Sequence, residues 1–224
     1  QATDAGLRIE APGAYIVNSL FIGSTTSQVA SLLLAANVDI SVYADNGTIV
    51  NNIFIGGQPL TLGSVDQCVV VGNTIRDVLN TSGWAMKVDS GSVGALYNIV
   101  ANNTFHNIRQ GIEITGSGGV GASYTKIYNN SIIEGGGISL VSGIVESTAN
   151  ADFNQIRNNT VKGATTPYTI AGATTQFLMR GNVAYNGSNV VVWQDEVTGA
   201  ATVASGQTTI VVTHGLGTTP TRVW

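Results

Sequence analysis

The residues best placed to do chemistry in this chain are two carboxylates, Asp89 and Glu113. They belong to the alternating stretches "AMKVD" and "GIEIT", which are typical of two short strands. If those strands pair side by side, the carboxyl groups lie diagonally across them, about 8 Å apart from strand rise and interstrand spacing. That separation falls within the roughly 6.5–9.5 Å expected of an inverting glycosidase, in which one carboxyl is the general acid and the other activates water.

Two neighbours of this pair would suit a sugar ligand. Trp84 lies just upstream and could stack on a sugar face, and Lys87 would lie beside Glu113 on the adjacent strand. The simpler interpretation, which the pattern favours, is a solvated face with a cross-strand Lys87–Glu113 pair worth under about 1 kcal/mol. Charged outward columns are normal on soluble sheets. The same outward column is expected to contain Thr61, Ser139 and Thr169.

Two further clusters are candidates for glycan contact. The stretch "VVWQDEV" contains Trp193 and Asp195, which would form a sugar-binding lip; a trimer contact or a solvated bend is the simpler interpretation. Arg157 and Arg180 follow Tyr128 at one outward position of a repeat described below. They would either bind acidic saccharides or pair across a trimer interface, and the sequence leaves both open.

Composition excludes several classes of function. Only 10% of residues are charged and the formal net charge is -4, so the chain has no basic footprint for nucleic acid. No apolar run approaches the length of a membrane span. The single cysteine, Cys68, lies in "QCVVV" and predicts a buried, inert thiol, not a disulfide framework or a metal site. "GSGGVG" at 116–121 is followed by no helix, which argues against a dinucleotide site. We therefore expect no metal and no cofactor.

The elements that position these residues are set by an internal repeat. A motif of the form "IVNNIF" recurs seven times at intervals of 21 to 33 residues. Apolar residues lie three positions before and two positions after each anchor. The anchors are the second residues of the asparagine pairs: Ser19, Asn52, Asn73, Asn103, Asn130, Asn159 and Asn182.

A second alternating strand follows in the middle copies of the repeat. Period-two alternation joined by turn residues is strand chemistry, and the connections are too short for crossover helices. We therefore predict an all-β fold, a single-stranded parallel β-helix of about seven coils. The inward pairs of the second strands are expected to be Leu60/Leu62, Met86/Val88, Ile112/Ile114, Ile138/Leu140 and Tyr168/Ile170.

The asparagines have a physical reason in such a coil. Each coil bends sharply between strands, and asparagine tolerates the left-handed conformation that a corner needs. Stacked asparagine amides can also hydrogen-bond from one coil to the next, as in other in-register ladders. Glycine replaces the first asparagine at Gly72 and Gly181. Tyr97, Tyr124 and Phe153, six residues before successive anchors, are expected to form a packing stack.

The repeat, with its "N-N-x-φ" corners and "G-φ-x-φ" strands over residues 14 to 195, resembles the right-handed parallel β-helix of the pectin-lyase-like superfamily. That fold hosts lyases, hydrolases and non-enzymatic spikes, so the resemblance implies architecture more than activity. A polysaccharide lyase of this superfamily would need a calcium-binding acidic cluster beside a basic residue. Here only Asp89 and Glu113 gather on one face, which makes a lyase the weaker enzymatic alternative.

The segment after Gly199 lacks the repeat. Its stretch "SGQTTIVVTHGLGTTPT", 205–221, resembles a short β-module near the C-terminal end of many bacteriophage tail spikes and tail fibres. We therefore expect a β-helix over 1–195 and a small C-terminal β module over 196–224 that caps or trimerises it, in a fragment of a longer protein. The resemblance implies a homotrimeric, virion-borne or extracellular protein that contacts host-surface polysaccharide. The alternatives are a glycan-degrading enzyme and a purely structural or adhesive solenoid.

Overall fold

The computed structural model describes residues 7–23, 30–37, 42–79, 83–91, 94–116, 121–148, 150–170 and 178–194, with the backbone alone at 30–37, 42–43 and 192–194. Every regular element within these ranges is a β-strand. The predicted C-terminal module over 196–224 lies outside the described residues.

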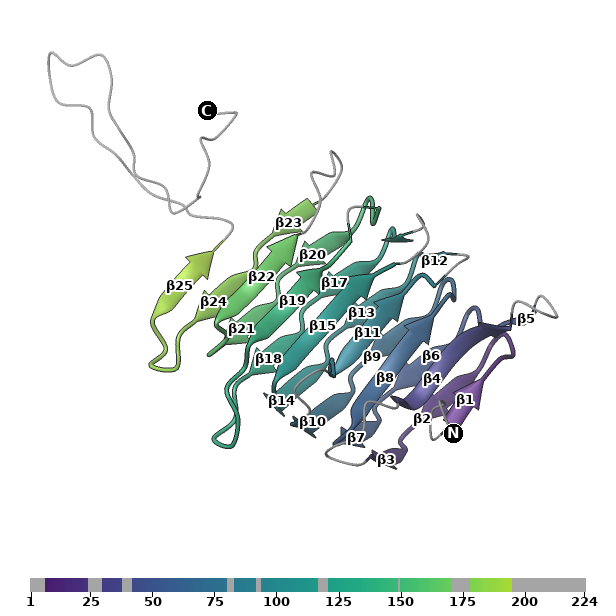
Figure 1. Cartoon of the computed structure of the whole chain (residues 1–224), viewed down its shortest axis with the longest axis horizontal. Coiled ribbons are helices and arrows are strands. Elements are labelled where there is room, and N and C mark those ends of the chain that lie inside the picture. Colours follow the sequence, from purple (N-terminus) through teal and green to yellow (C-terminus); the bar gives the residue numbers. More distant parts are fainter. Residues whose placement is uncertain are drawn as a thin grey trace, which may run out of the picture.

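The strands form an all-β parallel β-solenoid of about four turns with three parallel sheets (Figure 1). Sheet A contains β1 (Leu7–Ile9), β4 (Ala30–Asn37), β8 (Gln58–Gly63), β11 (Met86–Asp89), β15 (Gln110–Thr115), β19 (Ser142–Glu146) and β22 (Thr166–Ile170). Sheet B contains β2 (Tyr15–Val17), β6 (Thr48–Val50), β9 (Val69–Val71), β13 (Ile99–Ala101), β17 (Lys126–Tyr128), β20 (Gln155–Arg157) and β23 (Leu178–Arg180).

In the sequence, each strand of sheet C follows a strand of sheet B. Sheet C contains β3 (Leu20–Ile22), β7 (Ile53–Ile55), β10 (Thr74–Val78), β14 (Thr104–Ile108), β18 (Ser131–Ile133), β21 (Thr160–Lys162) and β24 (Val183–Tyr185). Short elements complete the fold: β5 (Val42–Tyr43), antiparallel to β4; β12 (Ala95–Leu96), parallel to β16 (Ala122–Ser123); and β25 (Val191–Gln194), antiparallel to β24.

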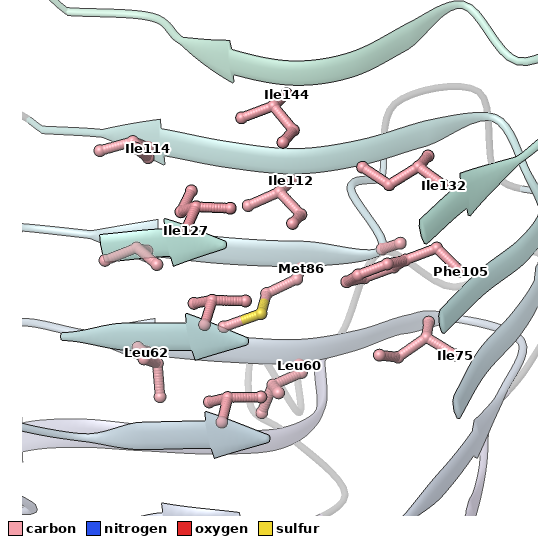
Figure 2. Close-up of a cluster of buried hydrophobic side chains, with 14 of the residues drawn as sticks. Leu60, Leu62, Ile75, Met86, Phe105, Ile112, Ile114, Ile127, Ile132 and Ile144 are labelled. Atoms are coloured by element: carbon pink, nitrogen blue, oxygen red, sulfur yellow. The ribbon is translucent and has the colours of Figure 1, made fainter. Parts of the chain in front are cut away.

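The core consists of the apolar columns that the repeat predicts. Each strand pairs with the strand of the next turn in a register that aligns like residues, so Val100 pairs with Val70 on one side and Ile127 on the other. In sheet C, Phe105 likewise pairs with Ile75 and Ile132. These side chains are fully buried, and Figure 2 shows Ile75, Phe105, Ile127 and Ile132 among those that fill the interior of the coil. The predicted alternation is therefore confirmed for sheets B and C.

The asparagine anchors form a hydrogen-bonded column at the corner between sheets B and C, which we call the anchor column. In it, Asn103 Oδ1 accepts from the backbone N of Asn73 at 2.9 Å and from its Nδ2 at 3.0 Å. Asn103 in turn donates from N and Nδ2 to Asn130 Oδ1, both at 3.0 Å. Nδ2 also donates to the carbonyl of Val70 at 3.1 Å. The same pattern runs from Asn52 to Asn182, so the predicted ladder is confirmed.

The two asparagines of each pair do different work. The first one is exposed and occupies the left-handed region, with φ of 55° at Asn102 and at Asn129. Gly72 and Gly181, where glycine stands in the first position, have φ of 68° and 69°. The second residue is the buried anchor. The first position therefore turns the chain, and the second bonds successive turns together.

A second buried polar column lies at the opposite end of the sheet B strands, one residue before each. It contains Cys68, Asn98, Thr125 and Asn154, all 0% exposed. Asn98 Oδ1 accepts from Cys68 N at 3.0 Å, and Asn154 Oδ1 accepts from Thr125 N at 2.8 Å. Burial raises the pKa of the Cys68 thiol to about 11, which agrees with the predicted buried thiol that is not a nucleophile.

The predicted second strand of one coil is wrong. Residues 137–141 do not join sheet A; instead, Gly135 and Ile138 form an isolated antiparallel bridge around a tight turn. Sheet A is continued by β19, which puts Ile144 beside Ile112. The close approach of backbones selects this register, because a Cβ at Gly111 would lie 2.2 Å from the Gly143 carbonyl oxygen.

This shift places a carboxylic acid inside the solenoid. Glu146 occupies the inward position beside Ile114 and Ile170 and is 0% exposed. Its Oε2 accepts from Asn154 Nδ2 at 2.9 Å, whereas its buried Oε1 has no partner among the described residues. Burial raises its pKa, the Asn154 hydrogen bond partly opposes that, and nearby Asp152 raises it further. The repeat in the sequence predicts Leu140 at this position, so this prediction is wrong.

Candidate functional site

The outward face of sheet A holds the predicted carboxylate pair. Lys87 on β11 pairs with Glu113 on β15, as expected, and Thr61 and Thr169 share their column. Val145 of β19 pairs with Glu113 in the place predicted for Ser139, because the strand begins later than expected. From this register Asp89 lies diagonal to Glu113, about 8 Å away by strand rise and interstrand spacing.

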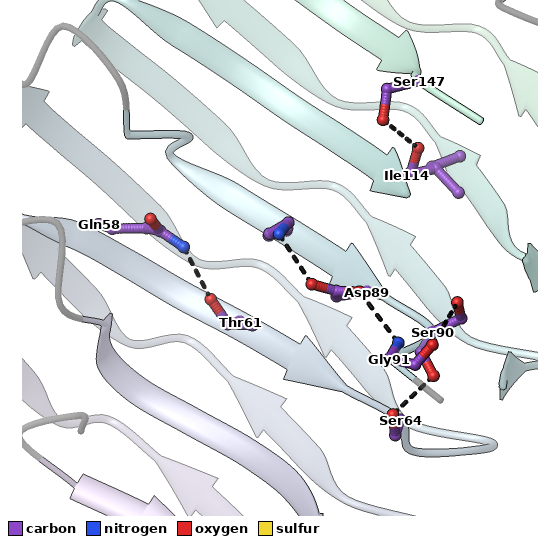
Figure 3. A network of polar contacts seen from close by, with 9 residues as sticks. Gln58, Thr61, Ser64, Asp89, Ser90, Gly91, Ile114 and Ser147 are labelled. Carbon is purple, nitrogen blue, oxygen red and sulfur yellow. Dashed lines mark hydrogen bonds and ion pairs between the residues drawn. The ribbon is translucent and has the colours of Figure 1, made fainter. Parts of the chain in front are cut away.

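The ion pair on this face differs from the expected one. Lys87 Nζ lies 2.7 Å from Asp89 Oδ2 on its own strand, so the predicted Lys87–Glu113 pair is replaced. Asp89 Oδ1 also accepts from the Gly91 amide at 3.0 Å, and Figure 3 shows the Asp89 carboxylate between these two donors. Two residues along one strand project from the same face, which brings Lys87 and Asp89 together.

The two carboxylates lie in different electrostatic surroundings. Burial raises the pKa of Glu113, and it prevails over a hydrogen bond from Ser147 and the charge of Lys87, both of which lower it. The charge of Asp89 raises the pKa further. Asp89 instead accepts hydrogen bonds from the Lys87 ammonium and from the Gly91 amide. Two carboxyl groups in such different surroundings could serve as a general acid, here Glu113, and as a base, here Asp89.

The two tryptophans predicted to contact sugar lie in different parts of the structure. Trp84 is half-buried, two residues before β11 and three before Lys87. Trp193 lies on β25, where it pairs with Ala184, at the far end of the solenoid from Trp84 in the order of turns. Asp195 lies outside the described residues. The structure therefore gathers Lys87, Asp89 and Glu113 on one face and separates Trp193 from them.

A hollow of about 390 Å³ lies on another face, the outward surface of sheet B. We call it the sheet B groove. It crosses three consecutive strands, β13, β17 and β20, and the corners that follow two of them. Its lining residues are Ile99, Lys126, Tyr128, Asn129, Gln155, Arg157 and Asn158.

The upstream corners of the same three strands carry the predicted aromatic stack. Tyr124 lies between Tyr97 and Phe153, with ring centroids 4.8 Å and 4.6 Å apart and planes 21° and 2° from parallel. All three residues have positive φ, between 57° and 61°, which is costly for bulky side chains. The packing stack is confirmed, and its parallel rings help to offset the backbone strain.

Sequence reasoning missed most of the groove. It identified Tyr128 and Arg157 as register neighbours, which is confirmed, and Arg180 pairs next to Arg157. It did not single out Lys126 and Gln155, which pair with each other two residues earlier on the same face. The sequence could have placed both residues on the outward face, because each precedes an inward isoleucine by one position.

Comparison with protein-family models, curated proteins and solved structures finds no match to this chain. Within the described ranges, no cluster of three His, Cys, Asp or Glu side chains is arranged to hold a metal ion. Over the same part of the chain, no helix has the length and hydropathy of a membrane span.

Proposed function

We propose that this chain is a glycan-binding β-solenoid, the shaft of a bacteriophage tail spike or tail fibre that contacts host-surface polysaccharide. The sheet B groove carries this proposal. It combines a tyrosine ring with amide and cationic side chains, a mixture that suits the apolar faces and hydroxyl edges of a sugar. The lining residues stand on paired strands and ladder corners, so little ordering entropy is lost when a ligand binds.

The proposal includes a finer architecture. We propose right-handed coils, about seven in number, one for each anchor. In support, each of the seven anchors directly precedes a strand of sheet C, and connections between parallel strands of one sheet are almost always right-handed.

We also propose a homotrimer, on a virion or otherwise extracellular. Support comes from an apolar patch on sheet C, where Leu20, Ile22 and Ile53 are 59%, 71% and 43% exposed. Exposed apolar clusters of this kind favour association between chains. Mass measurement of the full chain in solution tests this point, and a stable monomer would argue against it.

The second candidate function is an inverting glycosidase on the face of sheet A. The contrast between Glu113 and Asp89 favours it: Glu113 would protonate the glycosidic oxygen, and Asp89 would take a proton from the attacking water. Lys87 would hold the Asp89 carboxylate in position through their ion pair, and Trp84 would stack on the sugar. If Asp89→Asn and Glu113→Gln leave depolymerisation of the bound glycan intact, this active site is wrong.

A glycan array tests the leading proposal. The labelled full chain is applied to bacterial surface polysaccharides, acidic and neutral, and we expect selective retention on one class. Tyr128→Ala should weaken retention, whereas Tyr185→Ala, on the outward face of sheet C, is the matched control and should not. Failure of the folded chain to retain any polysaccharide would contradict glycan binding.

A further inference from the structure

The charge of sheet B is unusual for this chain. The formal net charge is -4, with 13 acidic and 9 basic residues. None of the seven sheet B strands contains an Asp or Glu, yet three of them contain Lys126, Arg157 and Arg180. All three cations lie in the last three strands of the sheet, which include two of the three strands of the groove. A positive surface on an acidic chain calls for a specific reason.

The register gathers the groove cations around a tyrosine. Lys126 pairs with Gln155, and Tyr128 pairs with Arg157, so the four form a two-by-two patch on one face. Lys126 and Arg157 occupy its diagonal, where backbone positions are about 8 Å apart. Long side chains at diagonal positions on adjacent strands are close enough to contact each other. A ligand atom above the centre of the patch would lie within reach of both cations.

These two cations are available to a ligand. Both are exposed, and the ion pairs recorded among the described residues involve neither of them. By contrast, Arg76 and Lys87, on other sheets, pair with Asp77 and Asp89. Among the described residues, the groove thus keeps two charges without a carboxylate partner, and an anionic ligand would supply that partner.

The corner after the groove strands adds neutral hydrogen-bonding groups. Asn129 and Asn158 are exposed, and their φ values of 55° and 52° lie in the left-handed region, at the corners that lead from sheet B into sheet C. Both backbones are fixed by the next turn, because Asn129 N donates to Arg157 O and Asn158 N donates to Arg180 O. Side-chain amides at these positions can both donate to and accept from sugar hydroxyls.

We propose that the sheet B groove selects anionic saccharides, with an acidic sugar held so that its carboxylate lies between Lys126 and Arg157. Tyr128 would support the sugar ring, and Asn129 and Asn158 would contact its hydroxyls. Arg157 offers the planar, two-pronged donor geometry that matches a carboxylate, and Lys126 adds a point charge. This inference rests on the proposed glycan binding and names the class of ligand.

The experiment uses the full chain and one probe in two charge states. Oligogalacturonate and its methyl ester differ in carboxylate charge and share a backbone, and both are titrated calorimetrically beside the acidic and neutral polysaccharides of the array. We expect acidic probes to bind and the ester to bind about tenfold more weakly or not at all. Affinity for the acidic probe should also fall as salt is raised.

Matched variants locate the charge. Arg157→Gln should weaken binding of the acidic probe about tenfold and Lys126→Gln somewhat less, because the arginine makes the bidentate contact. Arg76→Gln and Lys162→Gln remove the same side chains from the outward face of sheet C and should leave affinity unchanged. Circular dichroism of each variant shows that it is folded.

The outcomes separate this inference from the proposed function. If neutral polysaccharides bind as well as acidic ones, or Arg157→Gln behaves like Arg76→Gln, the anionic groove is overturned while glycan binding stands. If the folded chain binds neither acidic nor neutral probes, both proposals fail. Binding of acidic probes that Arg157→Gln and Lys126→Gln impair, and that Arg76→Gln and Lys162→Gln leave unchanged, supports both.

Discussion

The two buried polar columns of the solenoid use the same amide in different ways. In the anchor column, asparagine follows asparagine, so each buried Oδ1 from Asn73 to Asn182 accepts two hydrogen bonds from the preceding turn. In the second column, asparagine alternates with Cys68 and Thr125, whose side chains cannot continue the ladder. The anchor column is continuous, and the second column is a series of separate links.

The interruption leaves unsatisfied groups near the second column. Thr125 Oγ1 and Glu146 Oε1 are both buried without a partner among the described residues. Glu146 also takes one of the hydrogen bonds of Asn154 Nδ2. Hydrogen-bonded chains polarise one another, and a partly satisfied network loses that benefit. We infer that the anchor column holds the turns together and that the second column is a local weak point.

Breaking the anchor column should have the largest effect. Asn103→Ala removes the acceptor of Asn73 N and the donor to Val70 O, leaving both buried. We expect a loss of about 3–5 kcal/mol in the free energy of unfolding, measured by denaturant titration. The matched control is Asn102→Ala, at the exposed left-handed position next to it, which should cost about 1 kcal/mol. Equal losses would contradict the division of work between the two asparagines.

Breaking the second column should cost less. Asn98→Ala removes the acceptor of Cys68 N and the donor to Val65 O, with no neighbouring asparagine to disturb. We expect a loss of about 1–3 kcal/mol by the same titration. A loss as large as that of Asn103→Ala would show that continuity of the ladder adds nothing.

Repairing the second column should stabilise the protein in a pH-dependent way. The folded-state pKa of Glu146 is raised above its usual 4.5, so the folded chain binds this proton more tightly than the unfolded chain does. The contribution of Glu146 to stability is therefore complete below about pH 4.5 and is lost as pH rises through the folded pKa. Glu146→Gln keeps the shape without the charge.

We expect Glu146→Gln to raise the thermal unfolding midpoint at pH 8 by a few degrees. This corresponds to a gain on the order of 1–2 kcal/mol in the free energy of unfolding. The gain should shrink as pH falls through the raised pKa of the folded state, because the native carboxyl then becomes protonated. The buried charge also predicts that wild-type stability declines more steeply than that of the variant as pH rises through the folded pKa of Glu146. A variant less stable than wild type at pH 8 would show that the carboxylate is compensated in the folded state.

How well the sequence predicts each part of the fold depends on how clear the sequence pattern is there. The spacing of the anchors and the period-two alternation predicted sheets B and C in register, because one strand face must be buried and a one-residue shift would expose it. The stretch 137–146 was ambiguous, since it contains two Gly-Ile pairs, Gly137–Ile138 and Gly143–Ile144. Only backbone proximity, at Gly111 against Gly143, selects the second pair.

The site was less predictable than the fold. The Lys87–Glu113 register followed from the repeat, but the ion pair to Asp89 depends on rotamers that no repeat specifies. The groove was missed because its hollow arises from side-chain volumes across three turns, although the strand positions of Lys126 and Gln155 could be read directly. Glu146 was missed because it follows from the misplaced strand.

The smallest effect is expected at the first asparagine of a pair, where only backbone conformation matters. Asn102 is exposed and left-handed with φ of 55°, and glycine already serves at the equivalent Gly72. Asn102→Gly should therefore change the free energy of unfolding by no more than about 0.5 kcal/mol. Asn102→Val, a β-branched residue that resists positive φ, should cost about 1–2 kcal/mol. Denaturant titration of the two variants separates backbone strain from hydrogen bonding: if glycine is as harmful as valine, the exposed amide itself stabilises the corner, and the two asparagines share one role.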